Sequence, residues 1–240
     1  MTEKGASAVA RSPDLLAVGG SSMRWTGERL VIDIDERATW LFCPIHPRVR
    51  GRVTLDPAML AAPAFALDPG GRHHWRGIAP LARVKVEMEQ PDLSWSGSGY
   101  FDCNWGSEGL EEGFADWQWS RAHVGREAAV LYEGVRRDGS RFASALRFDA
   151  AGVPHEEPLP LGAPLPRTKW LMNRRTRADR GRAQVLRTWE DSPFYARSAV
   201  NTHLFGQQVT AVHESLSLDR FRTPIVQGML PYKMPRRSKA

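Results

Sequence analysis

The sequence predicts an all-β, antiparallel protein. Short runs alternate apolar and polar residues, and Gly, Pro and Asp residues that form turns separate these runs at regular intervals. No long stretch shows helical periodicity. Many short strands divided by such turns are typical of antiparallel barrels and sandwiches. At 240 residues, 42% of them hydrophobic, the chain is long enough to bury a substantial core.

The strands of the first 150 residues are placed by the turns between them. Met23–Trp25 and Arg29–Asp35 flank Thr26-Gly27-Glu28, and two later runs flank Arg137-Asp138-Gly139-Ser140. Both connections are typical of β-hairpins. A loop with a short helical turn is expected at 105–113, where Glu108, Glu111 and Glu112 lie. Further strands are predicted at 48–55, 64–67, 73–75, 83–88, 93–104, 115–124, 127–136 and 141–148.

Proline divides the chain. Residues 151–167 contain five prolines and predict an extended linker. We therefore expect a β domain over 1–150 that carries the site, the linker, and a β domain over 168–240 with a basic tail. Strands of the second domain are predicted at 168–173, 183–190, 195–205 and 209–218.

Composition excludes several classes of protein. Two cysteines, Cys43 and Cys103, form no disulfide framework and indicate a reducing compartment. The N-terminus lacks the apolar core of a secretory signal, and no run is long enough to span a bilayer. The net charge of +6 comes without a zinc-finger spacing or an RNP-type strand, which disfavours a nucleic-acid partner. A cytoplasmic location is expected.

The C-terminal segment leaves one peripheral interaction open. Residues 224–240 combine apolar residues with Lys233, Arg236, Arg237 and Lys239. Such a segment is suited to the anionic surface of the inner or photosynthetic membrane, and a solvated tail is the alternative.

The richest candidate for a site is the predicted strand ending at Asn104. At strand period, Tyr100, Asp102 and Asn104 share one face, whereas Phe101, Cys103 and Trp105 share the other. A phenol, a carboxyl and an amide one pleat apart suit the wall of a cavity. The solvent face of an ordinary amphipathic strand would show the same pattern.

Other motifs point to no cofactor or metal. The chain has no GxSxG elbow, no P-loop and no GxGxxG that opens a helix. His73 and His74 are adjacent, so on a strand they point to opposite faces, and a pair at a turn edge is favoured over a metal site.

Several segments together resemble the carotenoid 1,2-hydratases, also called hydroxyneurosporene synthases. The resemblance is carried, in chain order, by Gly99-Tyr100-Phe101-Asp102-Cys103-Asn104-Trp105-Gly106, Trp117-Gln118-Trp119-Ser120-Arg121-Ala122-His123, Leu131-Tyr132 with Arg137-Asp138-Gly139, Ser192-Pro193-Phe194-Tyr195-Ala196-Arg197 and His213-Glu214-Ser215-Leu216-Ser217-Leu218-Asp219-Arg220-Phe221. These segments span nearly the whole chain. The resemblance implies two lipocalin-like β-barrel or sandwich domains and the addition of water to the terminal C1=C2 bond of acyclic carotenoids such as neurosporene and lycopene. It implies no cofactor, and the partners are the carotenoid and water.

Two departures from the family accompany the resemblance. Some relatives have His where this chain has Cys103. Relatives also carry further strands before the Met1 segment, so we expect the first domain to be shortened and its cavity incomplete.

The implied reaction assigns roles to the candidate residues. A proton must reach C2, a tertiary cation must form at C1, and water must attack it. Asp102 is the first choice of proton donor, and Glu133, next to Tyr132, is the reserve. Ring faces stabilise the cation, and Tyr100 and Asn104 orient the water or the carboxyl. The catalytic candidates are Tyr100, Asp102, Asn104, Trp105, Tyr132 and Glu133, and the substrate-binding candidates are Phe101, Trp117, Trp119 and Arg121.

The same residues also have structural explanations, and two other functions compete with hydration. Large aromatic residues on strands usually belong to a core, and Arg121 suits an ion pair with a carboxylate of the 105–113 loop. A non-catalytic carrier of a long apolar ligand and a cyclase on the same scaffold remain the competing functions.

Overall fold

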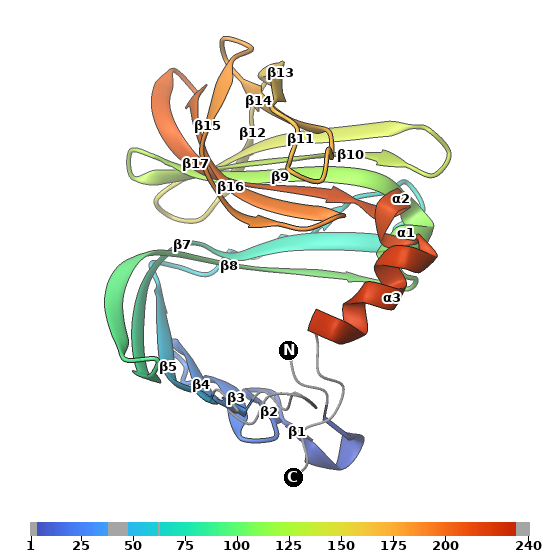
Figure 1. Ribbon diagram of the computed structural model, residues 1–240. Helices are drawn as coiled ribbons and strands as arrows, with labels where there is room; N and C mark the ends of the chain where they lie inside the picture. The colour runs from blue at the N-terminus through green and yellow to red at the C-terminus, as the bar shows by residue number, and fades with distance from the viewer. Residues whose placement is uncertain (1–3, 38–47, 62, 234–240) are drawn as a thin grey trace. The chain divides into compact units, whose positions relative to one another are not determined.

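The computed structural model describes residues 4–37, 48–61 and 63–233. Its strands pair antiparallel throughout, which confirms the predicted fold class (Figure 1). The described strands form open sheets, with no closed barrel among them. Two compact units are present. Unit 1 comprises Met1–Met59, Leu81–Phe101 and Gln227–Ala240, and unit 2 comprises Leu60–Pro80 and Asp102–Val226.

Unit 1 is built from hairpins that follow one another in sequence. Its strands pair in the order β1-β2-β3-β4-β5-β7, and β8 pairs with β7. The predicted hairpin at Thr26-Gly27-Glu28 is confirmed, because β3 and β4 pair there and Gly27 has a φ of 97°. The strands are β1 (Val9–Arg11), β2 (Leu15–Val18), β3 (Ser21–Trp25), β4 (Leu30–Arg37), β5 (Arg48–Pro57), β7 (His73–Gln90) and β8 (Leu93–Gly106). Both β7 and β8 continue into unit 2.

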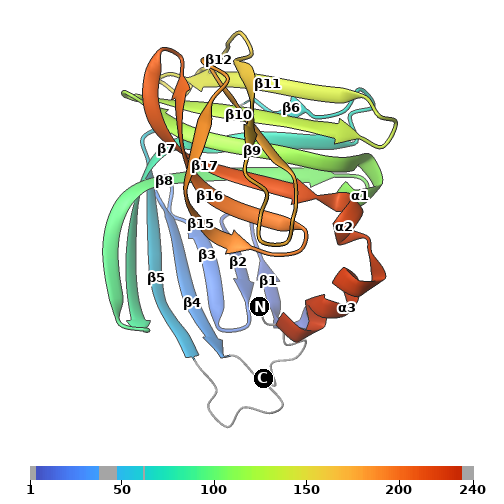
Figure 2. The same ribbon diagram turned by 45° about the horizontal axis from the view of Figure 1, so that its top comes forward.

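Unit 2 contains a seven-stranded sheet in the order β12-β11-β10-β9-β17-β16-β15 (Figure 2). β17 pairs with β9, so a strand from after the proline-rich segment lies beside a strand from before it. The sheet strands are β9 (Phe114–Val124), β10 (Glu127–Arg136), β11 (Arg141–Phe148), β12 (Pro154–Glu156), β15 (Ala183–Asp191), β16 (Tyr195–Leu204) and β17 (Gln207–Ser217). The remaining strands are β6 (Phe65–Ala66), which pairs with β7, and the hairpin β13 (Leu161–Leu165) and β14 (Arg174–Ala178).

The two faces of this sheet differ in side-chain size. Ala122, Ala129 and Ala211 are cross-strand partners and share one face, which we call the alanine face. It carries the core cluster of Ala122, Val124, Ala129, Leu131, Ala145, Leu204, Val209 and Ala211. Trp117 and Tyr132 lie on the opposite, aromatic face, because strand side chains alternate.

Helices are short and few among the described residues. They are a 3₁₀ turn at Ala6–Ala8, α1 (Leu110–Gly113), α2 (Leu218–Phe221) and α3 (Pro224–Lys233). The helical turn expected in the 105–113 loop is confirmed as α1. The sequence pattern did not indicate α3, which starts at Pro224, a residue suited to the first position of a helix. No helix in the described part of the chain has the length and apolar character required to cross a bilayer.

Two differences concern the segment around the prolines. The strand predicted at 168–173 is wrong: these residues form a turn closed by Leu171 N–H to Thr168 O, with Leu171 at a φ of 58°, and β14 starts at Arg174. Residues 151–167 contain β12 and β13 and belong to unit 2. The compact units thus do not follow the boundaries predicted at 151–167, since the β9–β17 pairing joins segments from both sides. Cys43 and the basic tail over 234–240 lie outside the described residues.

Candidate active site

The candidate site is centred on Trp75 and Asp102 in unit 2. Trp75, on β7, is 1% exposed, and Asp102, on β8, is half-buried. The indole Nε1 donates a hydrogen bond to Asp102 Oδ2 at 2.7 Å. Such a bond to a carboxylate is short and fixes the orientation of the acceptor. The carboxyl of Asp102 is therefore held against the edge of a buried indole.

Aromatic rings surround Trp75. The ring centroids of Trp75 and Tyr132 are 6.0 Å apart, with the rings edge to face, and the ring centroids of Tyr132 and Trp117 are 5.7 Å apart. We call the following six residues the aromatic cluster: Phe65, Trp75, Trp117, Tyr132, Phe142 and Phe148. Gly134 lies between Trp117 and Phe142 in the strand register, and a Cβ there would approach the Phe142 ring to 2.6 Å. A glycine at this position makes room for the rings on either side.

A cavity of about 420 Å³ opens beside the aromatic cluster. Its walls include Phe65, Trp75, Tyr132 and Phe142, and Glu156 and Glu157 also line it. The volume is at the lower end of the range found for small-molecule sites, which suits one end of a long apolar ligand. The ring that fixes Asp102 is thus also a wall of the cavity.

Tyr132 joins the cluster to Asn104. Its hydroxyl donates to Asn104 Oδ1 at 3.3 Å. Burial raises the pKa of Tyr132 well above its ordinary value, and the charges of Asp102 and Glu214 act in the same direction. The phenol is therefore a neutral donor, bonded to Asn104 and influenced by the charge of Asp102 on the same strand, β8.

A row of side chains crosses the aromatic face at this level. Tyr132, Trp119, Glu214 and Arg197 are successive cross-strand partners on β10, β9, β17 and β16. Arg197 pairs with Glu214 at 2.8 Å. Burial and the charge of Glu214 raise the pKa of neighbouring Tyr195. No local sequence pattern indicates that Glu214 lies near Tyr132, because their proximity depends on the β9–β17 pairing.

Glu133, the reserve proton donor, lies on the alanine face. Its two oxygens accept hydrogen bonds from Arg175 at 2.8 Å and Arg177 at 2.5 Å. Arg175 also pairs with Asp116 at 2.7 Å. This geometry favours a role for Glu133 in fastening β14 to the sheet, and it separates Glu133 from Tyr132 across the sheet.

The other candidates are placed as follows. Trp105 is on the face of β8 opposite Asp102 and stacks on His74, with ring centroids 5.3 Å apart. Buried Arg121 donates to Pro80 O at 3.0 Å. Tyr100 and Phe101, both half-buried, belong to the part of β8 assigned to unit 1. The structure thus brings together Asp102, Asn104, Tyr132 and Trp117, with Trp119 in the adjoining row.

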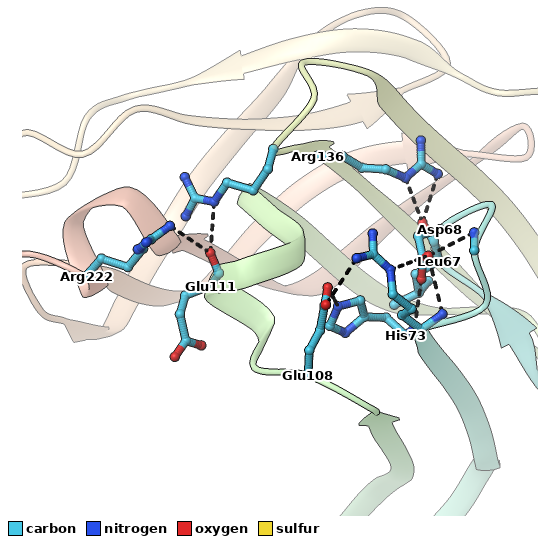
Figure 3. Close-up of polar contacts among 10 residues, drawn as sticks. Leu67, Asp68, His73, Glu108, Glu111, Arg136 and Arg222 are labelled. Atoms are coloured by element: carbon cyan, nitrogen blue, oxygen red, sulfur yellow. Dashed lines mark hydrogen bonds and ion pairs between the residues drawn. The ribbon is translucent and has the colours of Figure 1, made fainter.

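A polar network anchors the start of β7 (Figure 3). Asp68 Oδ1 accepts from His73 N–H at 2.7 Å, and His73 Nε2 is 3.1 Å from Glu108 Oε1. Arg136 donates to Leu67 O at 2.8 Å. Burial by itself would raise the pKa of Asp68, but the N–H donors of His73, Arg72 and Gly70 outweigh it, so that the pKa is lowered. This network fixes the turn two residues before Trp75.

Trp75 is a site residue that the sequence pattern does not indicate. The pattern predicts only a strand there, whereas the Trp75–Asp102 bond joins residues 27 positions apart. The only local indication of a site near Trp75 is its position beside His73 at a predicted turn. Within the described residues, no three His, Cys, Asp or Glu side chains lie close enough together to hold a metal ion.

The family follows from comparison with known proteins. The sequence profile described as carotenoid hydratase CrtC matches residues 1–240. The chain belongs to the carotenoid hydratase CrtC family. This confirms the resemblance inferred from the segments around Asp102, Trp117 and Glu214.

Relatives of this CrtC-family chain share its sequence over nearly its whole length. It is 48% identical over 238 residues to the acyclic carotenoid 1,2-hydratase of Thiocapsa roseopersicina and 40% identical over 238 residues to that of Cereibacter sphaeroides. The alignments cover 98% and 99% of this chain, but 58% and 84% of those relatives. A Nitrosomonas europaea crystal structure described as AttH has a TM-score of 0.55 at 14% identity, over 89% of this chain and 72% of that one. This likeness supports the β fold alone.

Proposed function

We propose that this CrtC-family chain adds water across the terminal C1=C2 double bond of an acyclic carotenoid of the neurosporene or lycopene type. The observation that carries the proposal is the Asp102 carboxyl, which accepts a hydrogen bond from Trp75, a wall residue of the aromatic-lined cavity. Relatives named acyclic carotenoid 1,2-hydratase support the substrate class.

Asp102 is the proton donor in this proposal. The protonated carboxyl transfers its proton to C2, and the π electrons of the double bond form the new C–H bond. A tertiary cation is left at C1. Water attacks C1, and the proton it loses returns to the Asp102 carboxylate. The products are one tertiary alcohol and the acid in its starting form, so no co-reactant is required.

Asp102 Oδ2 accepts a hydrogen bond from Trp75. The hydrogen bond from Trp75 favours the charged carboxylate, whereas an apolar polyene end in the cavity removes water and favours the neutral acid. The proposal therefore requires the bound polyene to exclude water from Asp102, so that the carboxyl is protonated when it acts as the proton donor.

Ring faces stabilise the cation, but they do not supply most of the rate. A desolvated cation–π contact contributes about 2 kcal/mol, or roughly thirtyfold in rate. Trp75 and Tyr132 line the cavity, and in this proposal their rings make the contact. Tyr132 and Asn104, which are hydrogen-bonded to each other, orient the attacking water in this proposal. The remaining acceleration rests on the proton transfer from Asp102.

Expression in cells that accumulate lycopene or neurosporene tests the proposal. The parent chain should convert the pigment into a product heavier by one water. Asp102→Asn retains the shape and still accepts from Trp75, yet it has no acidic proton, so product should fall by roughly 100-fold or more. Asp92→Asn makes the same change in the exposed turn between β7 and β8 and should leave conversion unchanged.

Each outcome is informative. No product from the parent, with pigment still bound, would favour a carrier, and a product of unchanged mass would favour a cyclase. Full conversion by Asp102→Asn would remove Asp102 from the mechanism while leaving the hydratase activity in place.

A further inference from the structure

Four large apolar side chains of unit 2 are exposed near the β14–β15 edge. Trp170 and Leu171, in the turn before β14, are 48% and 65% exposed. Leu186 and Trp189, on β15, are 53% and 50% exposed. Single exposed apolar residues are ordinary, but tryptophans and leucines gathered on adjoining segments mark interaction surfaces.

The two segments are joined in the structure. Lys169 N–H donates to Asp191 Oδ2 at 2.8 Å, which ties the turn to the end of β15. Arg220 donates to Trp170 O at 2.6 Å and to Leu171 O at 3.1 Å. Hydrogen bonds to its backbone thus hold the turn in place, while the side chains of Trp170 and Leu171 remain exposed to solvent.

Bulges present Leu186 and Trp189. Val185 and Arg187 of β15 pair with two successive residues of β16, so Leu186 between them has no partner in the register. Trp189, between Thr188 and Glu190, is left out of the register in the same way. A bulge reorients the extra side chain and interrupts the ladder of an edge strand. β15 is the last strand of the sheet order, so these two bulges disfavour pairing with a strand of another chain.

Positive charge accompanies the apolar residues. Arg167 and Lys169 flank the turn, Arg187 is on β15, and Arg180 and Arg182 precede it; all five are exposed. None of the five forms an ion pair with another residue in the described ranges. Glu190 is the exposed carboxylate on β15. The excess of cations is complementary to an anionic partner.

We propose that this surface docks unit 2 on an anionic lipid bilayer. The docking surface consists of Trp170, Leu171, Leu186 and Trp189 together with Arg167, Lys169, Arg180, Arg182 and Arg187. Tryptophan prefers the bilayer–water interface, leucine enters the acyl boundary, and arginine and lysine bind anionic headgroups. This proposal does not depend on the hydratase activity, and it assigns membrane contact to a different part of the chain from the C-terminal tail.

Sedimentation of the purified full chain with vesicles tests it. We expect binding to vesicles of phosphatidylcholine with phosphatidylglycerol, weaker binding to phosphatidylcholine alone, and a decrease at high salt. The double variant Trp170→Ala/Leu171→Ser should reduce partitioning roughly tenfold, and Trp189→Ala should also reduce it. Arg167→Gln/Lys169→Gln should remove much of the preference for the anionic vesicles.

Trp95→Ala is the matched control, because Trp95 is 50% exposed on the unit 1 part of β8. It should leave partitioning unchanged. Vesicle binding that is absent in the parent, or equal in the parent and the Trp170/Leu171 variant, would overturn the proposal. So would a dimer in sedimentation velocity that the same substitutions dissociate, since the surface would then bind a second copy. No carotenoid enters this assay, so its failure and a failure of hydration are told apart.

Discussion

The indole N–H of Trp75 and the carboxylate of Asp102 are 2.7 Å apart, N to O, although the residues lie on different strands and 27 positions apart in sequence. The same indole packs edge to face with Tyr132 and walls the cavity. One side chain therefore connects the candidate proton donor to the candidate substrate site.

Replacement of Trp75 by Phe should separate these two roles. Phenylalanine retains a ring in the cluster but has no N–H, so Asp102 loses its donor. A hydrogen bond to a charged group is worth about 1.5–3 kcal/mol, which predicts a loss of roughly ten- to hundredfold in hydration rate. The rate is measured per folded protein, with the folded fraction taken from thermal unfolding. Trp95→Phe, at an exposed position, should behave as the parent, and an unchanged rate in Trp75→Phe would exclude the positioning role.

Replacement of Tyr132 by Phe tests its neutral hydroxyl. Because burial raises the pKa of Tyr132 well above 10, the phenol remains protonated across the working pH range. Loss of one neutral hydrogen-bonding group should reduce the rate roughly two- to tenfold without changing the shape of the pH–rate profile. The profile is measured with the purified chain and detergent-dispersed lycopene. An alkaline limb that is present in the parent and absent in the variant would contradict this.

Much of the fold was predictable because it is encoded locally. Alternation places the strands, and Gly27 and Gly139, both at positive φ, place two of the hairpins. The 168–173 turn was not predictable, because its apolar residues match a strand pattern while Leu171 adopts a left-handed conformation. The domain arrangement depends on the β9–β17 pairing, which no local pattern specifies.

The candidate site was predictable to the extent that one strand carries it. Asp102 and Asn104 are two residues apart, and both reach the Trp75–Tyr132 region, as strand alternation requires. Trp75, Glu214 and the arginine partners of Glu133 come from other strands. Glu133 follows Tyr132 in sequence, but adjacent strand residues point to opposite faces, so it lies on the other side of the sheet, bound to Arg175 and Arg177.

Replacement of Glu133 by Gln should affect stability more than chemistry. Gln cannot neutralise Arg175 and Arg177, and truncating one partner of a largely buried ion-pair network is destabilising. The guanidinium groups are partly exposed, so we expect a decrease of up to about 3 kcal/mol in the free energy of unfolding, measured by denaturant titration. Glu89→Gln removes an exposed pair with Arg50 and should change it by less than about 1 kcal/mol. A large loss of rate in fully folded Glu133→Gln would restore Glu133 as an acid candidate.

His213 should make the stability of unit 2 sensitive to acid. It is buried on the alanine face, where its Nε2–H donates to Arg175 O at 2.8 Å. Burial, together with the charges of Arg174 and Arg175, lowers the pKa of His213 to about 4. The unfolded chain has an ordinary histidine pKa near 6.5, so between these values the unfolded state binds the extra proton. Stability is thus fully present above about pH 6.5 and is lost as the pH falls toward 4.

The expected loss of stability on acidification is large enough to measure. The difference between the two pKa values corresponds to up to about 3 kcal/mol. His213→Gln retains an N–H donor for Arg175 O but does not titrate, so its free energy of unfolding should fall less steeply between pH 7 and pH 4 than that of the parent. His203→Gln, at a half-buried position on β16, should retain the slope of the parent. If His213→Gln and the parent lose stability equally over this range, His213 contributes nothing to the acid response. Its pKa would then be the same in the folded and the unfolded chain, which would contradict the lowering of the pKa by burial.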